Sequence, residues 1–398
     1  MNEARRKLGF VNIAHFADHY VLLIFPTVVL GLEGELNRPY GELIALSTAC
    51  FVAFGLFSLP AGWLGDHWSR RRMIGIFFFG AAASLFAAAV SPNVIVLAVA
   101  LFALGVFAAI YHPVGVTVLL ANATDRGRTL ATNGVFGNLG VALAPGITAF
   151  IAFHFGWRLA FAVPAFLCAA IGVAYFAMTS EVKENPAGRA QTAEVRMTFA
   201  TATVFFGVYA LLSFAGGLVF NTVTISIPKI IDEGMRDNVP LTWIGWVATI
   251  VLLFGGAAQL TVGRLVSRFS PPLLFAAIGI VQAIGVTWAT FATGFPLLVA
   301  LAVSIAAIYA QITVGDVVIA RYTADAWRGR IYAVRFFLAF ISSGLAVSMI
   351  AALYGRGGFE LVLGATASFA TVFAICTVLI ALLASRIEGG AGRMQPAE

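Results

Sequence analysis

The sequence predicts an all-α polytopic membrane protein, and three observations support this fold class. Of the 398 residues, 61% are hydrophobic and only 11% are charged, with a mean hydropathy of +0.95. A soluble domain has about 25% charged residues. Apolar stretches near or above the roughly 20 residues that cross a bilayer recur along the whole chain. The positive charges gather in alternate segments between these stretches.

Charges and Pro/Gly clusters divide the chain into twelve expected spans. The first six run from 8–31, 42–64, 73–91, 93–121, 129–153 and 157–180. The second six run from 198–227, 240–266, 271–291, 294–320, 331–354 and 359–385. No cleavable signal is expected before the first span, because "MNEARRK" leads directly into it without a small-residue cleavage site.

The Lys and Arg residues orient these spans. If both termini lie inside, the inside segments hold 19 of the 24 Lys and Arg, and the five outside are Arg38, Arg158, Lys229, Arg236 and Arg356. Lys229 follows Pro228 at the outer end of its span and is expected to be exposed. The asymmetry predicts cytoplasmic N- and C-termini in a bacterial-type inner membrane. The net charge of +6 then reflects a cytoplasmic face that meets the lipid bilayer, so no nucleic-acid partner is expected.

The chain divides into two similar halves. The polar stretch 181–197 reads as a cytoplasmic linker between an N-terminal six-helix bundle, 1–180, and a C-terminal one, 198–398. "AAIY" occurs at 108–111 and at 306–309, "RGR" at 126–128 and at 328–330, and "GWLGDHW" from Gly62 aligns with "GRLVSRF" from Gly263. The offsets are nearly constant and the topology matches. Such parallel duplication is typical of transporters whose substrate site lies between the halves, near the midplane.

The loop "GWLGDHWSRRR", 62–72, resembles the signature loop of the major facilitator superfamily. Gly62, Leu64, Asp66, Arg70 and Arg71 match that pattern, whereas His67 replaces an Arg and Ser69 replaces a Gly. The resemblance implies a twelve-helix fold in two pseudo-symmetric bundles. It also implies a conformational latch of Gly62, Asp66, Arg70 and Arg71 toward Arg330 and Ile331 at the start of the eleventh span. The alternative is that the arginines only anchor the topology.

Two further stretches resemble the fosmidomycin-resistance subgroup of efflux proteins in this superfamily. They are "IYHPVG", 110–115, and "RGRTLATNGVFGNLGVALAPG", 126–146, although this chain has Ala-Pro-Gly where the subgroup has Gly-Pro. In the second stretch Gly137, Gly140, Pro145 and Gly146 lie on a span-5 helix. Small residues there let helix backbones approach closely, and Pro145 removes a backbone donor. Close packing without any role in transport is an equal alternative.

"HFADHY", 15–20, places His15, Asp18 and His19 on one helical face, because they are spaced i, i+3 and i+4. At 1.5 Å per residue they lie about 10–17 Å into the first span, near the midplane. Ionisable groups at this depth usually face an interior cavity and pair with one another. His112, beside Pro113 in the fourth span, is the expected partner, since the first and fourth spans are neighbours in the family's fold.

Three interpretations of this cluster remain open. In the first, Asp18 is the main protonation site for proton coupling, with His15, His19 and His112 as partners. In the second, His15, Asp18, His19 and His112 bind a transition metal such as zinc or ferrous iron. In the third, the histidines only hold the first and fourth spans together.

Additional polar residues are expected to line the same cavity. Tyr309, Gln311 and Asp316 lie in the tenth span, the repeat counterpart of the fourth, and Asp316 is expected to be a buried C-half contact. Asn138 in the fifth span faces the cavity or bonds locally.

The sequence predicts a monomeric secondary transporter and no enzyme. No nucleophile–base set stands out and no GxxxxGK[ST] occurs, so neither catalysis nor ATP drive is expected, and a proton gradient is the expected energy source. A channel suits two homologous halves less well. Proton-coupled export of a small organic or amphipathic molecule is the preferred function. The alternatives are a transporter of a metal ion or metal chelate, and a proton symporter that imports a small metabolite.

Overall fold

The computed structural model describes residues 3–181, 198–235, 239–323 and 325–391, and the regular elements in them are all helices. The first eight are α1 (Glu3–Leu36), α2 (Tyr40–Ala45), α3 (Thr48–His67), α4 (Arg70–Ala89), α5 (Val94–Ala108), α6 (Tyr111–Asn122), α7 (Arg126–Phe155) and α8 (Trp157–Met178). The others are α9 (Phe199–Met235), α10 (Leu241–Leu265), α11 (Pro271–Phe291), α12 (Gly294–Tyr322) and α13 (Asp325–Ala391). Most of the expected linker, 182–197, lies outside the described residues.

These helices provide 11 membrane-length segments among the described residues. The second is made of α2 and α3, and the fourth of α5 and α6. The last, Phe337–Glu388, is 52 residues long. Its helix is interrupted at Gly357 and Gly358, where Gly358 has a φ of 57°, a conformation that glycine adopts readily. Each part is long enough to cross a bilayer, so the break supplies the twelfth span. The predicted all-α membrane fold is confirmed.

Local sequence signals explain where several helices begin. The Ser69 hydroxyl accepts a hydrogen bond from the Arg72 amide at the start of α4, and the Asp125 carboxylate accepts one from the Arg128 amide at the start of α7. Both are N-caps that satisfy otherwise unpaired amides. Pro113 lies in the first turn of α6, where its missing N–H leaves no bond unmade. A new helix, α6, therefore begins at Tyr111, just before His112.

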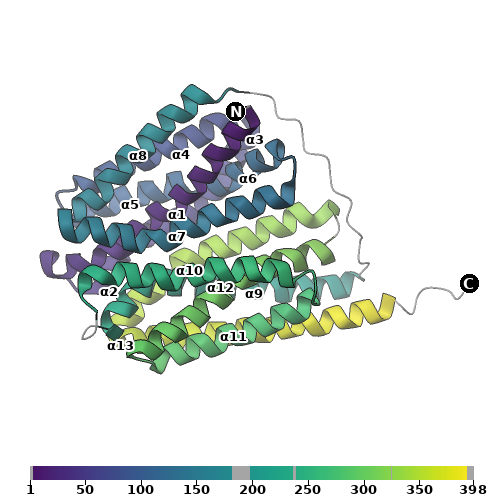
Figure 1. Cartoon of the computed structure of the whole chain (residues 1–398). Helices are drawn as coiled ribbons and strands as arrows, with labels where there is room; N and C mark the ends of the chain where they lie inside the picture. The colour runs from purple at the N-terminus through teal and green to yellow at the C-terminus, as the bar shows by residue number, and fades with distance from the viewer. Residues whose placement is uncertain (1–2, 182–197, 236–238, 324, 392–398) are drawn as a thin grey trace, which may run out of the picture.

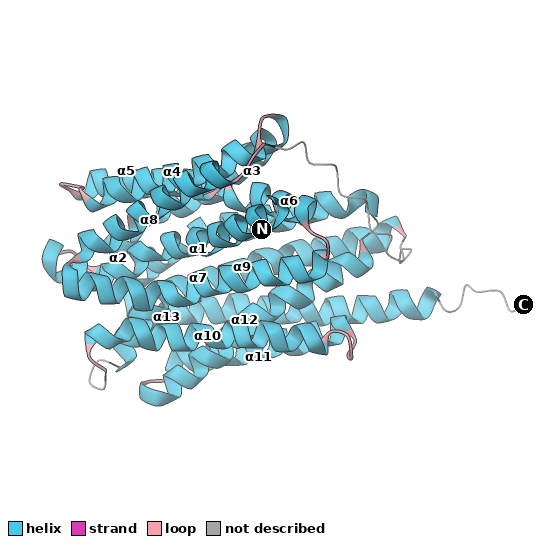
Figure 2. Cartoon of the chain, turned by 45° about the horizontal axis from the view of Figure 1, so that its top comes forward, coloured by secondary structure: helices cyan, strands magenta, loops and turns pink. Residues whose placement is uncertain are grey.

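The helices run roughly alongside one another (Figure 2) in two groups. Helices α1 and α3–α8 occupy the upper part of Figure 1, and α9–α13 the lower part. The groups meet where α7 packs on α10 and α3 packs on α13. Large apolar side chains, such as Phe166 and Ile284, stand exposed on the outside, as expected for a multi-pass protein whose solvent is lipid.

The bundle has two distinct ends. We call the end where α1 begins and α13 finishes the terminal end; in Figure 1, α1 begins near the top and α13 finishes at the right. The opposite end, where α1 finishes and α2 lies, is the far end. The ion pairs Asp66–Arg70, at 3.1 Å, and Arg321–Glu388, at 2.8 Å, each join residues of the same group at the terminal end.

At the far end, charged and aromatic residues join the two groups. Lys229 of α9 pairs with Glu33 of α1, and also with Asp232 at 3.3 Å and Glu233 at 3.7 Å in its own helix. The Lys229 ammonium lies 5.6 Å from the centre of the Tyr40 ring. We call these five residues the far-end network.

The prediction that Lys229 is exposed is therefore wrong, because the residue is only 4% exposed. Its three carboxylate neighbours compensate the buried charge, as a buried cation requires. A pocket of ≈ 370 Å³ beside it, lined by Glu33, Lys229 and Asp232 among others, opens at this end and not at the midplane histidines.

Candidate functional site

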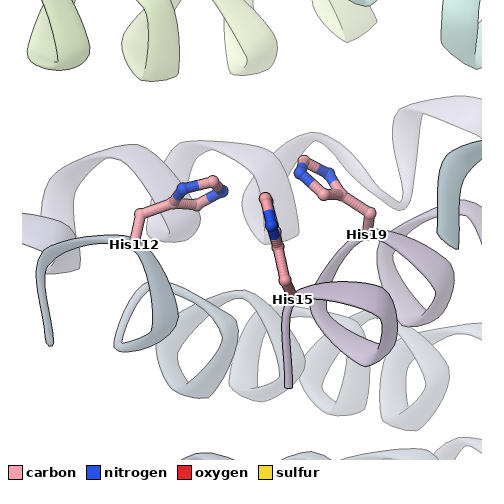
Figure 3. Close-up of side chains that lie close together, drawn as sticks. All are labelled: His15, His19 and His112. Carbon is pink, nitrogen blue, oxygen red and sulfur yellow. The ribbon is translucent and has the colours of Figure 1, made fainter. Parts of the chain in front are cut away.

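Three histidines from two helices gather near the middle of the N-terminal group. His15 and His19 come from α1 and His112 from α6, and Figure 3 shows the three rings facing one another. The ring centroids are 5.0 Å apart for His15 and His19, 5.4 Å for His15 and His112, and 5.3 Å for His19 and His112. One nitrogen from each ring lies within 4.8 Å of the others. We call these residues the histidine cluster; all three are partly exposed.

His15 is held from two sides. Its Nδ1 lies 2.8 Å from the backbone oxygen of Asn133, which accepts the hydrogen bond when Nδ1 carries the proton. The ring of Tyr111 stacks on its face, with centroids 4.7 Å apart and planes at 20°. The Asn133 amide in turn bonds with the Tyr111 hydroxyl and with Asn12. This network fixes the His15 ring and leaves Nε2 as the nitrogen with a lone pair.

Asp18 is completely buried beside the histidine cluster. Its side chain is 0% exposed, and its Oδ2 lies 3.4 Å from Nε2 of His112 without the geometry of a hydrogen bond. Neither carboxylate oxygen has a hydrogen-bond partner among the described residues. A buried carboxylate in that condition is costly when charged, and the His112 imidazole is the basic group that faces it.

Helix α7 approaches the cluster through its glycines. A methyl group at Gly137 would collide with the His15 ring, and one at Gly140 would collide with the backbone oxygen of Phe16 in α1. Further along, the Gly146 amide donates to Thr249 Oγ1 of α10 at 3.1 Å, and the Pro145 carbonyl lies against Gly245 of α10. The small residues thus let α7 contact both α1 and the C-terminal group closely.

Asn138 links the two groups of helices. Its side-chain amide donates a hydrogen bond to the Gln259 carbonyl oxygen of α10. Phe340 of α13 closes the site from another direction, with ring centroids 5.1 Å from His112 and 5.0 Å from Phe54. The histidine cluster therefore borders the interface between the groups.

The residues of the C-terminal group that were expected in the cavity differ in their burial. Tyr309 and Gln311 are buried in α12, and the Tyr309 hydroxyl and the Gln311 Oε1 have no hydrogen-bond partner among the described residues. The expectation that Asp316 is a buried charge is wrong: its side chain is 44% exposed and pairs with Arg335 of α13. Arg335, which falls within the expected span 331–354, supplies the partner from inside α13.

The residues of the expected latch lie at the terminal end. Gly62 packs against Pro113, next to His112, and Asp66 pairs with Arg70 at 3.1 Å. Arg71 donates to the backbone oxygen of Phe176 in α8 at 2.7 Å and covers the Phe176 ring. The side chain of Arg330, the expected C-terminal partner, lies outside the described residues.

Sequence reasoning missed several polar residues of this site. Tyr111 and Asn12 hold Asn133, and Gln259 meets Asn138. A lone amide within an apolar span, as in "GGAAQL" around Gln259, is a signal that could have identified that position. Asn12 and Tyr111 become recognisable only once α1, α6 and α7 are placed together.

Comparison with curated proteins finds two relatives that match part of the chain. An uncharacterized MFS-type transporter, YfnC, of Bacillus subtilis (strain 168) is 26% identical over 145 residues, which is 36% of this chain and 36% of that protein. A probable L-galactonate transporter of Escherichia coli (strain K12) is 29% identical over 157 residues, 38% of this chain and 33% of that protein. The matched region thus spans about a third of each relative's length.

Solved structures match the fold over nearly the whole chain. A bacterial homologue of the human lysosomal transporter Spinster, inward-facing and unoccupied, aligns with a TM-score of 0.78 at 11% identity, covering 97% of this chain and 98% of that one. A D-xylose–proton symporter aligns at 0.71 with 16% identity, covering 96% and 97%. The nucleoside transporter NupG aligns at 0.73 with 13% identity, covering 95% and 99%.

The family model described as "Major Facilitator Superfamily" matches residues 8–242. This range includes the histidine cluster, Asp18, the loop 62–72 and the linker. Because the match covers more than half of the chain, the protein belongs to the major facilitator superfamily.

Proposed function

We propose that this protein is a proton-coupled secondary transporter that exports a small organic molecule by alternating access. The observation that carries the proposal is Asp18, which is 0% exposed, has no hydrogen-bond partner among the described residues and lies 3.4 Å from Nε2 of His112. Within a membrane such a carboxylate is unfavourable when charged and unpaired. It is therefore a group whose proton can be exchanged as its surroundings change.

The neighbouring imidazoles provide the other half of the coupling. With the proton on Asp18, both it and a neutral His112 are uncharged; with a proton on His112 and none on Asp18, the two form an ion pair. Histidine is the side chain whose ordinary titration lies near neutral pH. A solute that contacts the partly exposed histidine cluster changes the relative cost of these two states, which links its binding to proton transfer.

The arrangement of the ends supports alternating access. The far-end network joins the two groups of helices, and with the termini inside, as the positive charges predict, that end would be the outer one. The site of a cytoplasmically loaded exporter in a bacterial-type inner membrane would then be closed toward the outside. The orphaned Tyr309 hydroxyl and Gln311 Oε1 are candidate C-terminal contacts for the solute, because buried polar atoms are normally hydrogen-bonded.

Two likenesses support an organic solute and its export. The relative from Escherichia coli is named as a probable transporter of L-galactonate, which is a small organic acid. The resemblance of "IYHPVG" and of the α7 sequence to the fosmidomycin-resistance subgroup supports export. We propose a monomer that draws on the proton gradient and uses no further cofactor.

The test measures proton movement in proteoliposomes. Small organic compounds that raise the melting temperature of the purified protein identify candidate solutes, and a pH-sensitive dye then reports proton flux when each is added. The wild type should move protons in the direction opposite to the solute, Asp18→Asn should move none, and the exposed far-end variant Glu42→Gln should behave as wild type. Solute and protons moving in the same direction would show symport and refute export by antiport. Unchanged proton flux in Asp18→Asn would refute the assignment of the coupling site.

A further inference from the structure

We infer that His15, His19 and His112 form a binding site for one divalent transition-metal ion of the Zn²⁺ class. The three rings come from two different helices, and their centroids form a nearly equilateral triangle with sides of 5.0, 5.3 and 5.4 Å. The chain has five histidines, and these three are brought to one place in the fold.

The spacing of the rings matches tetrahedral coordination. An imidazole nitrogen binds zinc at about 2.0–2.1 Å, which places the ring centroid about 3.2 Å from the ion, and two such rings at the tetrahedral angle have centroids about 5.2 Å apart. The ligand nitrogens lie within 4.8 Å of one another, whereas around one zinc ion they would be about 3.4 Å apart. Rotation of the His19 and His112 side chains toward His15 would shorten these nitrogen–nitrogen distances.

His15 is already oriented as a metal ligand. Metal-bound histidines usually donate their second N–H to a carbonyl or carboxylate, which fixes the tautomer and the ring plane. His15 Nδ1 has this partner in the Asn133 backbone oxygen at 2.8 Å, so Nε2 is left to bind a metal. The stacked Tyr111 ring and the space left by Gly137 hold the imidazole in that plane.

Asp18 has the corresponding relation to His112. Its Oδ2 lies 3.4 Å from Nε2 of His112, so a small rotation of the ring would let an Nε2 proton bond to the carboxylate and leave the Nδ1 lone pair for a metal. The negative charge of Asp18 also compensates part of the charge of a dication, which would otherwise be costly in this buried position.

The donor set also selects the class of ion and leaves room for a further ligand. Imidazole nitrogens suit zinc, copper, nickel and iron, whereas Mg²⁺ and Ca²⁺ require oxygen ligands. Three protein ligands leave one tetrahedral position open, and the partly exposed rings face the interface between the two groups of helices. This inference rests on the proposed function only for its consequence in transport: the exported small organic molecule would supply the fourth ligand and be carried together with the ion.

The test is a titration of the tag-free, detergent-solubilised protein with Zn²⁺ and with Co²⁺, by calorimetry and by visible absorption respectively. One ion per chain should bind. Replacing His15, His19 or His112 by Ala should weaken binding more than about 100-fold, and Asp18→Asn should weaken it about 10–100-fold. His67→Ala and His154→Ala remove exposed histidines near helix ends and should leave binding unchanged. Mg²⁺ should not compete.

A second measurement keeps the test valid if a cluster variant fails to fold. Diethyl pyrocarbonate modifies accessible imidazoles, and mass spectrometry locates the modification. In the wild type, Zn²⁺ should protect His15, His19 and His112 but not His67 or His154. Absence of stoichiometric binding by the wild type, or equal modification of all five histidines with and without Zn²⁺, overturns the inference.

The metal inference and the proposed function can fail separately. Stoichiometric Zn²⁺ binding together with unchanged proton-driven transport in Asp18→Asn would keep the metal site and refute the coupling site. Proton flux that depends on Asp18 in a protein without Zn²⁺ affinity would do the reverse.

Discussion

The ion pair between Glu33 and Lys229 connects the two groups of helices at the far end, and Glu33→Gln should favour a state that is open there. Glu33 belongs to α1 and Lys229 to α9. The change removes the attraction between the groups and keeps the size of the side chain. Alternating access requires these contacts to break once in each cycle, so weakening them should raise the population in which they are broken.

The free-energy cost of Glu33→Gln depends on the ion-pair partners that Lys229 keeps. In the variant its ammonium still has Asp232 at 3.3 Å and Glu233 at 3.7 Å, so no buried cation is left unpaired. The loss is that of one hydrogen bond to a charged group, which contributes about 1.5–3 kcal/mol. Glu33 is 28% exposed, and solvent screening favours the lower part of that range, about 1.5–2 kcal/mol. The ratio of closed to open molecules should fall about 10- to 30-fold.

Spin-label distance measurements can detect this shift. Cysteines at Arg38 and Arg356, both exposed and on opposite groups of helices at the far end, would carry the labels. The three native cysteines are buried. The parent protein should show mainly a short distance, and Glu33→Gln should add a longer one.

Glu35→Gln is the matched control. Glu35 lies two residues away on α1, but its partners are Trp157 at 2.9 Å and Arg158 at 3.7 Å, both within the same group of helices. Glu35→Gln should leave the distance distribution unchanged. The same distribution in Glu33→Gln as in the parent, or an equal shift in Glu35→Gln, would refute the reasoning.

Two further predictions concern α7. Gly140→Ala should lower stability by about 1–3 kcal/mol, because the new methyl group collides with the backbone oxygen of Phe16. Gly134→Ala, with nothing within 4 Å, should be neutral or slightly stabilising; an equal fall in Tm for both would contradict the close approach of α1. Asn138→Ala and Gln259→Ala should each cost about 0.5–1.5 kcal/mol, because they share one hydrogen bond between the groups. The double variant should cost little more than either single one in thermal unfolding, and full additivity would show that the pair contributes nothing.

The spans were predictable because their cause is local. A bilayer demands about 20 apolar residues per helix whatever the rest of the chain does, so composition alone places most of them. The break at Gly357 and Gly358 was also predictable, because this glycine pair lies between two apolar stretches of membrane length. Asp18 and the nearby histidines were also recognisable, since charges are rare in the middle of a span.

The errors arose where the partner is distant in sequence. Lys229 reads as a solvated charge at a span end, yet the i, i+3, i+4 spacing of Lys229, Asp232 and Glu233 already indicates pairing within the helix. The bond to Glu33, 196 residues away, depends on how the groups of helices meet. Asp316 was misjudged because its partner, Arg335, lies 19 residues away on another helix, and only the placement of α12 beside α13 brings the two together.

The central claim is that Asp18 carries the coupled proton. The most direct test compares two transport assays of Asp18→Asn, solute exchange and solute accumulation. In proteoliposomes, exchange of labelled for unlabelled solute needs no net proton movement, whereas accumulation against a gradient driven by a pH difference does. We expect Asp18→Asn to retain exchange and to lose accumulation, because asparagine preserves the shape of the site but cannot release a proton. Undiminished pH-driven accumulation in Asp18→Asn would contradict the claim.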